Sequence, residues 1–243
     1  MKKLLFALCL YMPSLLFAQQ DPAPAYRSNI IKLNLTALAF RSISVQYEHQ
    51  VSRKFSLGVT ARYMPDGDVP MKSLIKNIAD DPETSKQIDN ATIGSFAITP
   101  EARFYLGKGN MRGFYIAPFV SFANYTASLD YAYDDNGTSE TIPLSGSVNT
   151  ITGGFLLGTQ YHLSSRLSID LWILGPHYGF SKGDLTGKKS LSSTEQQSLR
   201  DELDNLDIPL TKTTYTVDAN GATVNFKGPW GGIRSGISLG LRF

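Results

Sequence analysis

Cysteine and histidine are scarce in this 243-residue sequence, which contains one cysteine and three histidines. The cysteine, Cys9, lies near the N-terminus, so the remainder of the chain offers no internal disulfide, thiol nucleophile or cysteine-based metal site. His49, His162 and His177 are too far apart in the sequence to show metal-ligand spacing. We therefore expect no metal and no cofactor.

Long apolar runs and an excess of charge are also missing. Beyond residue 18, no segment has the ~20 consecutive apolar residues of a membrane-spanning helix, and the mean hydropathy is −0.13. Removing Lys2 and Lys3 from the 23 basic residues leaves 21, equal to the number of acidic residues. A chain with balanced charge is a poor nucleic-acid binder, so we expect no nucleic-acid partner.

The N-terminus has the order of a secretory signal. Lys2 and Lys3 precede an apolar stretch, Leu4 to Phe17, and the small residue Ala18 follows. This pattern predicts a signal peptide over residues 1–18, a tail over residues 19–28 and export from the cytoplasm. Leu8 stands directly before Cys9 where a lipid anchor would need a small residue, so no lipid anchor is expected.

The last twelve residues alternate apolar and polar side chains, and a strand places alternate side chains on opposite faces. One face carries Ile233, Ile237, Leu239, Leu241 and Phe243. The length suits a tilted membrane strand, which needs about 9–11 residues. The segment resembles the C-terminal assembly signal of Gram-negative outer-membrane barrels, with Leu239, Leu241 and Phe243 at the signal positions.

Seven earlier segments show the same period, which gives eight in all. They are residues 29–40, 43–51, 55–63, 94–106, 113–131, 148–163 and 166–180. Eight amphipathic strands behind a signal peptide predict an all-β fold, an antiparallel eight-stranded transmembrane outer-membrane β-barrel over residues 29–243. We expect it in the cell outer membrane, where its partners are outer-membrane lipid and, during biogenesis, the barrel-assembly machinery.

The connections differ in length. Residues 64–93, 132–147 and 181–231 form the three long ones, and bacterial barrels keep long loops outside the cell and short turns in the periplasm. Residues 69–79 have a helical pattern, and Ser192 with Glu195 resembles a capping box that opens a second helix. Asn220-Gly221 predicts a hairpin. It either projects from the last outside loop or adds two strands to the ring, making ten.

The polar faces of the predicted strands direct charge into the lumen. Eight charged residues share this inward register: Lys32, Glu48, Arg62, Glu101, Arg103, Asp170, Arg234 and Arg242. An eight-stranded barrel is just wide enough for side chains to fill it, and a lone buried ion is costly. We interpret the set as a salt-bridged structural plug, with a narrow, gated, anion-favouring path as the alternative.

Two further patterns concern aromatic and catalytic residues. Aromatic side chains near strand ends are typical of an interfacial girdle; they are Tyr47, Tyr63, Tyr105, Tyr161, Trp172, Tyr178 and Trp230. His162 and Ser164 resemble the His/Ser pair of lipid A deacylases, but Ser164 reads as a turn residue and the pair falls at the periplasmic rim. No catalytic residue is assigned.

Four runs resemble an uncharacterised family of small outer-membrane barrels, broadly similar to OmpA-type barrels. The runs are Ile31–Leu38, Gln46–Glu48, Thr99–Tyr105 and Gly113–Phe119. The resemblance implies a barrel with a domain of unknown function and carries over no catalytic residue. We expect a non-enzymatic protein with a structural or surface-binding role and an unidentified extracellular ligand. A small gated channel and a lipid-modifying enzyme are the alternatives.

Overall fold

The computed structural model describes residues 27–79, 89–135, 138–204 and 210–243. The predicted signal peptide, residues 1–18, and most of the predicted tail over residues 19–28 lie outside this range. In the part described, no helix is both long and apolar enough to cross a membrane.

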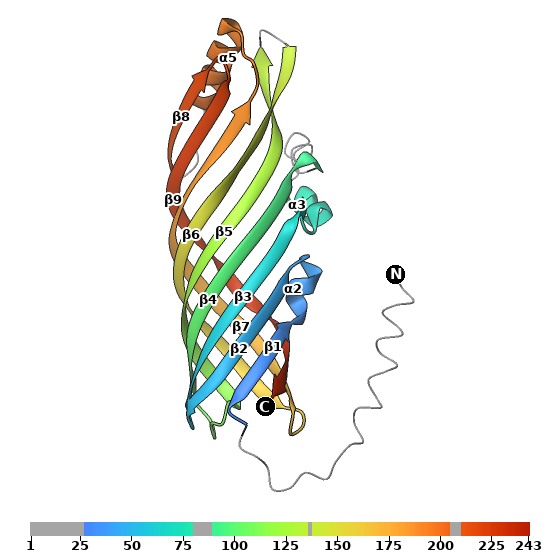
Figure 1. The fold of residues 1–243 in the computed structure, drawn as a ribbon, viewed down its shortest axis with the longest axis vertical. Coiled ribbons are helices and arrows are strands. Elements are labelled where there is room, and N and C mark those ends of the chain that lie inside the picture. The colour runs from blue at the N-terminus through green and yellow to red at the C-terminus, as the bar shows by residue number, and fades with distance from the viewer. Residues whose placement is uncertain (1–26, 80–88, 136–137, 205–209) are drawn as a thin grey trace, which may run out of the picture.

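Eight antiparallel strands form a closed ring (Figure 1). In ring order they are β1 (Asn29–Asn34), β2 (Ile43–Ser52), β3 (Phe55–Asp68), β4 (Thr92–Tyr105), β5 (Gly113–Asp135), β6 (Thr138–His162), β7 (Leu167–Lys188) and β9 (Gly221–Arg242). β1 pairs with β9 and closes the ring. The predicted eight-stranded barrel is confirmed.

The hairpin predicted at Asn220-Gly221 does not add strands to the ring. β8 (Lys212–Asp218) pairs with the start of β9 through Lys212↔Lys227 to Asp218↔Gly221. β9 itself runs on without a break into the ring, where it pairs with β7 along its whole length. The ten-strand alternative is therefore wrong, because one arm of the hairpin is the upper part of a ring strand.

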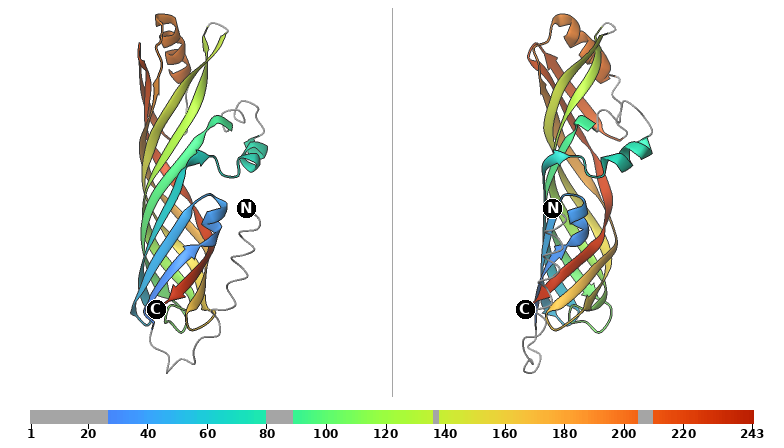
Figure 2. Two further views of the ribbon diagram at one scale, coloured as in Figure 1. Left: turned by 45° about the vertical axis from the view of Figure 1, so that its right-hand side comes forward. Right: turned by 90° about the vertical axis from the view of Figure 1, so that its right-hand side faces the viewer.

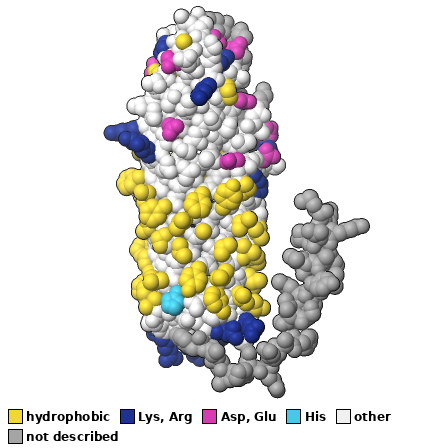
Figure 3. All heavy atoms as spheres, in the orientation of Figure 1, with side chains coloured by type: hydrophobic (Ala, Val, Ile, Leu, Met, Phe, Trp, Pro, Cys, Tyr) yellow, Lys and Arg dark blue, Asp and Glu magenta, His cyan; other side chains and the backbone are white. Residues whose placement is uncertain are grey.

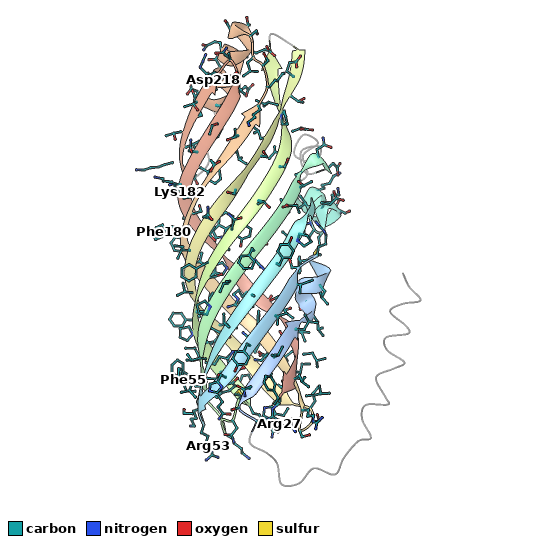
Figure 4. The ribbon with its side chains drawn as sticks, viewed as in Figure 1. Arg27, Arg53, Phe55, Phe180, Lys182 and Asp218 are labelled. Carbon is teal, nitrogen blue, oxygen red and sulfur yellow. The ribbon has the colours of Figure 1, made fainter. Side chains whose placement is uncertain are left out.

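On the face that Figure 3 shows, apolar side chains form a belt over the half of the ring where Asn29 and Phe243 lie. On β7 the outward side chains are apolar or aromatic up to Phe180, which is 74% exposed. The next outward positions are Lys182, labelled in Figure 4, and Asp184, and both are exposed. The change from apolar to charged marks the upper border of the belt. A greasy exterior around a polar interior is the arrangement of a transmembrane barrel.

Four strands extend well beyond this belt. β5, β6, β7 and β9 have 22–25 residues each, whereas crossing a bilayer takes about 9–11. The predicted long connection at residues 132–147 is thus mostly strand, with β5 ending at Asp135 and β6 beginning at Thr138. The alternation criterion missed these ends because outside the belt the outer face meets water and need not be apolar.

A small apolar core holds the outer end of these strands together. α5 (Ser193–Asp204) packs Leu199 and Leu203 against Ile142 of β6 and Val224 of β9. The predicted capping box is present: the backbone N–H of Glu195 donates to Ser192 Oγ at 3.2 Å, and Glu195 Oε2 accepts from the backbone N–H of Ser192 at 2.8 Å. This backbone hydrogen bond holds the pKa of the Glu195 carboxyl below its usual value.

The first strand is shorter than its pattern predicts. The alternation favours a strand over residues 29–40, but β1 ends at Asn34 and a short helix, α2 (Leu35–Ala39), follows. Asn34 causes the change, since its side-chain oxygen accepts from the backbone N–H of Ala37 at 3.0 Å and caps the helix. The second loop helix, α3 (Lys72–Ala79), begins three residues later than predicted.

The belt can be tested on a single strand. Leu157 lies on the outer face of β6 within the belt and is 44% exposed. Replacing it with arginine places a charge against lipid near the middle of the bilayer, at a cost of about 2–4 kcal/mol. We expect Leu157→Arg to lower the fraction of folded protein in the membrane. Fractionation followed by immunoblotting measures this.

Thr141→Arg provides the matched control, because Thr141 lies on the same face of β6 but beyond the belt. It should insert as the wild-type protein does. Equal loss in both variants would show that the belt has been assigned to the wrong part of the strand.

Candidate functional site

A cluster of buried ions fills the lumen at the level of β1. Its centre is the Lys32 ammonium, whose Nζ donates to Glu48 Oε2 at 2.5 Å, to Gln160 Oε1 at 2.5 Å and to Asp170 Oδ2 at 2.7 Å. An ammonium has three protons, so all of its donors are used. The lysine and both carboxylates are at most 1% exposed.

Arg103 forms the second cationic centre of this cluster. Its Nε donates to Glu101 Oε1 at 2.6 Å, Nη1 donates to Asp170 Oδ2 at 2.6 Å, and Nη2 donates to Gln46 Oε1 at 2.8 Å. The guanidinium carbon also lies 4.3 Å from the centroid of the Tyr115 ring. Charge-assisted bonds of this kind are about twice as strong as neutral ones.

The carboxylates receive further donors from the neighbouring strands. Glu48 Oε1 accepts from Ser56 Oγ at 2.5 Å and from Tyr105 Oη at 2.6 Å. Asp170 accepts from Tyr115 Oη at 2.7 Å and from Trp172 Nε1 at 3.1 Å. Each carboxylate is therefore held by two cations and two neutral donors. Full satisfaction of this kind is what allows charges to remain buried.

The structure brings together six of the eight charged residues that the sequence assigns to the lumen. The ion network consists of Lys32, Glu48, Glu101, Arg103, Asp170 and Arg234. Three cations face three carboxylates, so the cluster is neutral. Arg234 is its most peripheral member: it lies 3.4 Å from Glu101 Oε2, between the rings of Phe119 and Trp172.

The other two predicted lumen charges lie elsewhere. Arg62 is further along the barrel, where Nη2 donates to Tyr125 Oη at 3.3 Å. Arg242 lies at the end of the barrel where Asn29 and Phe243 meet, and it donates to the backbone oxygen of Ser165 at 3.1 Å. The alternation of side chains indicates which face of a strand points into the lumen, but it does not indicate how far along the lumen each residue lies.

The residues of the C-terminal signal lie where the ring closes. Leu241 and Phe243 are about half exposed, at 53% and 50%, and Leu239 is partly buried. Phe243 exchanges backbone hydrogen bonds with Asn29 at 2.9 and 3.1 Å. These contacts join the last residue of the chain to the first residue of β1.

Several residues of the site escaped the sequence analysis. Gln46 and Gln160 are buried in the ion network, and only their inward phase could have indicated it. Tyr105 and Trp172 were expected in an exposed girdle, but they are 2% and 6% exposed and lie in the lumen. Tyr105 and Trp172 each stand two residues after an inward-facing ion, Arg103 and Asp170, so the strand period of two places them inward as well. The prediction of a girdle gave weight to their aromatic character and not to this period.

A cavity of about 360 Å³ lies directly above the ion network, on the side away from Asn29 and Phe243. Trp172 and Arg234 form the boundary between the two. The cavity wall comes from all eight ring strands and α2, and hydroxyl-bearing side chains are the most frequent in it. Such a space is of the size of ordinary ligand pockets, which begin at about 300 Å³.

Neither metal binding nor a His/Ser pair is supported by the side chains described. Across the described residues, no group of three or more His, Cys, Asp or Glu could hold a metal ion. His162 Nε2 lies 3.0 Å from the backbone oxygen of Met111. Ser164 Oγ accepts from the backbone N–H groups of Arg166 and Leu167 and thus shapes a turn.

A family profile described as a protein of unknown function, DUF3575, matches residues 5–184. The chain belongs to this family. The resemblance to an uncharacterised barrel family is thereby confirmed. No curated protein matches the sequence.

Two solved structures align with most of the chain. The N-terminal β-barrel domain of Pseudomonas aeruginosa OprF has 9% identity and a TM-score of 0.26; the alignment covers 89% of this chain and 98% of that domain. The translocator domain of the autotransporter NalP from Neisseria meningitidis has 9% identity and a TM-score of 0.35, with 100% and 96% coverage.

The ion network predicts a large stability effect at Lys32. Lys32→Met removes the shared cation and leaves Glu48 and Asp170 facing each other in a buried site. Breaking a buried ion pair in this way costs about 3–5 kcal/mol. We therefore expect a lower guanidinium chloride concentration at the midpoint of unfolding, measured by tryptophan fluorescence.

Arg62→Met is the control, since Arg62 lies outside the ion network and has no carboxylate partner among the described residues. It should shift the midpoint much less. If both variants lose the same stability, the network contributes no more than any other lumen charge.

Proposed function

We propose that the protein is a non-enzymatic barrel of the outer membrane, with a closed lumen and a rigid projection that binds a ligand outside the cell. The observation that carries the membrane location is the apolar belt around a closed ring of strands. In lipid every backbone polar group must find an internal partner, and strands paired around a ring meet this demand over most of their length. The buried ions also support a membrane location, because they place charged side chains in the lumen and not on the exterior of the belt.

The orientation follows from the ends of the ring. Asn29 and Phe243 lie together at one end, next to the short β2–β3, β4–β5 and β6–β7 turns. In bacterial barrels short turns face the periplasm. The opposite end, with α3, α5 and the extended strands, would then face outward. The predicted signal peptide and the C-terminal signal agree with export and with assembly by the barrel-assembly machinery.

The shape of the outer end supports a binding role. β5, β6, β7 and β9 continue as a paired sheet, and α5 is fixed to them by the apolar core around Leu199. Arg200 Nη2 adds a hydrogen bond of 2.7 Å to the backbone oxygen of Val217 on β8. A preorganised surface loses little entropy on binding, unlike a flexible loop. The four strands are about twice as long as the membrane requires, and their outer parts form this surface.

The ion network argues against the channel alternative. It occupies the lumen with side chains that are almost wholly buried and mutually paired. Opening a path would separate charges in a poorly hydrated interior, which costs several kcal/mol per ion. The lipid-modifying alternative finds no support either, because Ser164 is engaged in a turn and is not paired with His162.

Single cysteines test the orientation. Ser73 on α3 and Ser193 on α5 are exposed at the outer end, and Ser165 is exposed in the β6–β7 turn. On intact cells, a membrane-impermeant thiol reagent should label Ser73→Cys and Ser193→Cys. Ser165→Cys should react only after the cells are opened. Labelling of Ser165→Cys alone would invert the barrel and remove the surface-binding role.

Conductance tests the closed lumen. The purified protein, added to a planar lipid bilayer, should insert without stable ion-conducting steps. An unrelated open porin prepared in the same detergent gives the positive control. Reproducible unitary steps that change in size when Arg62 or Arg234 is replaced would favour the channel alternative.

A further inference from the structure

The barrel wall is incomplete above the short first strand. β9 pairs with β8 through residues 221–227 and with β1 through residues 238–242. Between them, residues 228–237 pair with β7 on one side, but within the described chain no strand lies on the other side. An open strand edge at membrane depth is unfavourable unless it faces protein or a cavity.

Helix α2 covers only the lower part of this gap. It stands above β1 and beside β9 (Figure 2). Thr36 Oγ1 accepts from the backbone N–H of Ile237 at 3.0 Å, which satisfies one group of the free edge. Arg41 ties the following turn to β3 by donating to the backbone oxygens of Pro65 and Asp68. The helix is thus fixed in place beside an opening.

The cavity above the ion network reaches this opening. Ala37, Phe40, Ile233 and Ser235 belong to its lining, and Phe40 and Ile233 are 44% and 69% exposed. Ile233 pairs with Pro176, below the level of Phe180 at the upper border of the apolar belt. The mouth of the cavity therefore faces the lipid, in the half of the bilayer away from the termini.

The cavity has a surplus of positive charge. Arg62 and Arg234 line it, and no aspartate or glutamate does; because Arg234 is balanced by Glu101 in the ion network, the surplus is the charge of Arg62. Arg62 Nε is a buried donor with no hydrogen-bond partner among the described residues, and the ring nitrogen His177 Nδ1 has none either. A buried donor without an acceptor is costly, so Arg62 Nε indicates a missing acceptor. Hydroxyl groups line the same cavity, from Ser44, Thr60, Thr99, Ser121, Thr150 and Thr152.

We propose that this cavity binds the head group of an anionic single-chain amphiphile, a carboxylate or a phosphate, whose acyl chain passes between α2 and β9 into the outer leaflet. The head group would accept from Arg62 and from the hydroxyls. A volume of about 360 Å³ holds a head group and the first part of a chain, and the opening lets the rest remain in lipid. The inference rests on the membrane location proposed above.

The chain contains a built-in reporter for this site. Its two tryptophans, Trp172 and Trp230, both line the cavity. Trp172 is 6% exposed, so a quencher outside the barrel cannot touch it. In a Trp230→Phe background, protein purified from membranes in detergent would be titrated with palmitate brominated on the carbon next to the carboxylate. Bromine quenches tryptophan at contact, and saturable quenching of Trp172 is expected.

Three matched probes separate the sources of the signal. Palmitate brominated at the far end of the chain should quench weakly, since its bromine stays outside. The methyl ester of the first probe should not saturate the site, because it lacks the charge. Bromoacetate, a free anion without a chain, should require a far higher concentration. Equal quenching by bromoacetate would overturn the amphiphile, and equal quenching by the ester would overturn the charge recognition.

Variants then tie the signal to the residues. Arg62→Gln removes a charge-assisted hydrogen bond and should weaken binding about tenfold. Arg53→Gln, the same change at an exposed position near the opposite end of the barrel (Figure 4), should leave it unchanged. Ser235→Phe narrows the mouth and should slow or abolish quenching. Unchanged quenching in both Arg62→Gln and Ser235→Phe would overturn the proposal.

The variants are first compared by circular dichroism and by resistance of the folded barrel to unheated detergent. If Arg62→Gln does not fold, Ser235→Phe and the ester still decide the question. Because binding is measured in detergent, it does not depend on the orientation in the cell. A failed cysteine-labelling experiment and a failed binding experiment can therefore be told apart.

Discussion

The ion network is the constraint on which the rest of the barrel depends. Its hydrogen bonds and ion pairs reach every strand of the ring, through Lys32, Glu48, Ser56, Arg103, Tyr115, Gln160, Asp170 and Arg234. An eight-stranded ring has too little interior for a large apolar core, and an apolar exterior in contact with lipid would give no hydrophobic drive toward the inside. Directional polar contacts therefore carry much of the specificity that apolar packing supplies in water-soluble proteins.

The neutrality of the network also decides what the lumen above it can do. Because Lys32 and Arg103 already share their carboxylates, none is left over for Arg62, and Arg234 has only a long contact to Glu101. The charges of the lower lumen are thus balanced, whereas the cavity keeps a surplus of positive charge. The lumen therefore contains two neighbouring regions of different chemistry, the neutral ion network and the positively charged cavity. A cation that is partly removed from water is stabilised by an anion, so the cavity favours an anionic ligand.

Alternation along the chain was sufficient to predict the ring and its inward face, because a period of two is a local property. Of the eight charged residues that it assigns to the lumen, six lie in the ion network. It failed wherever a nonlocal or single-residue effect intervened. Asn34 ends β1 by capping a helix, and a register shift between Trp172 and Gly175 changes the phase of β7 against β9. Beyond the belt the outer face carries no apolar signal. The cavity could not be predicted, since it depends on how far along the lumen each residue lies.

Closure of the ring joins the first strand to the last, and this order has a consequence for assembly. Lys32 on β1 meets Asp170 on β7 only when β9 has brought the two edges of the sheet together. Until then the lysine, one carboxylate and the Arg103 guanidinium lack part of their partners. If the sheet closed with an additional strand, or with the pairing of β1 and β9 shifted by two residues, these ions would remain without their partners. The network thus favours a ring of eight strands in this register over other closures, because each of those would leave a buried charge unpaired.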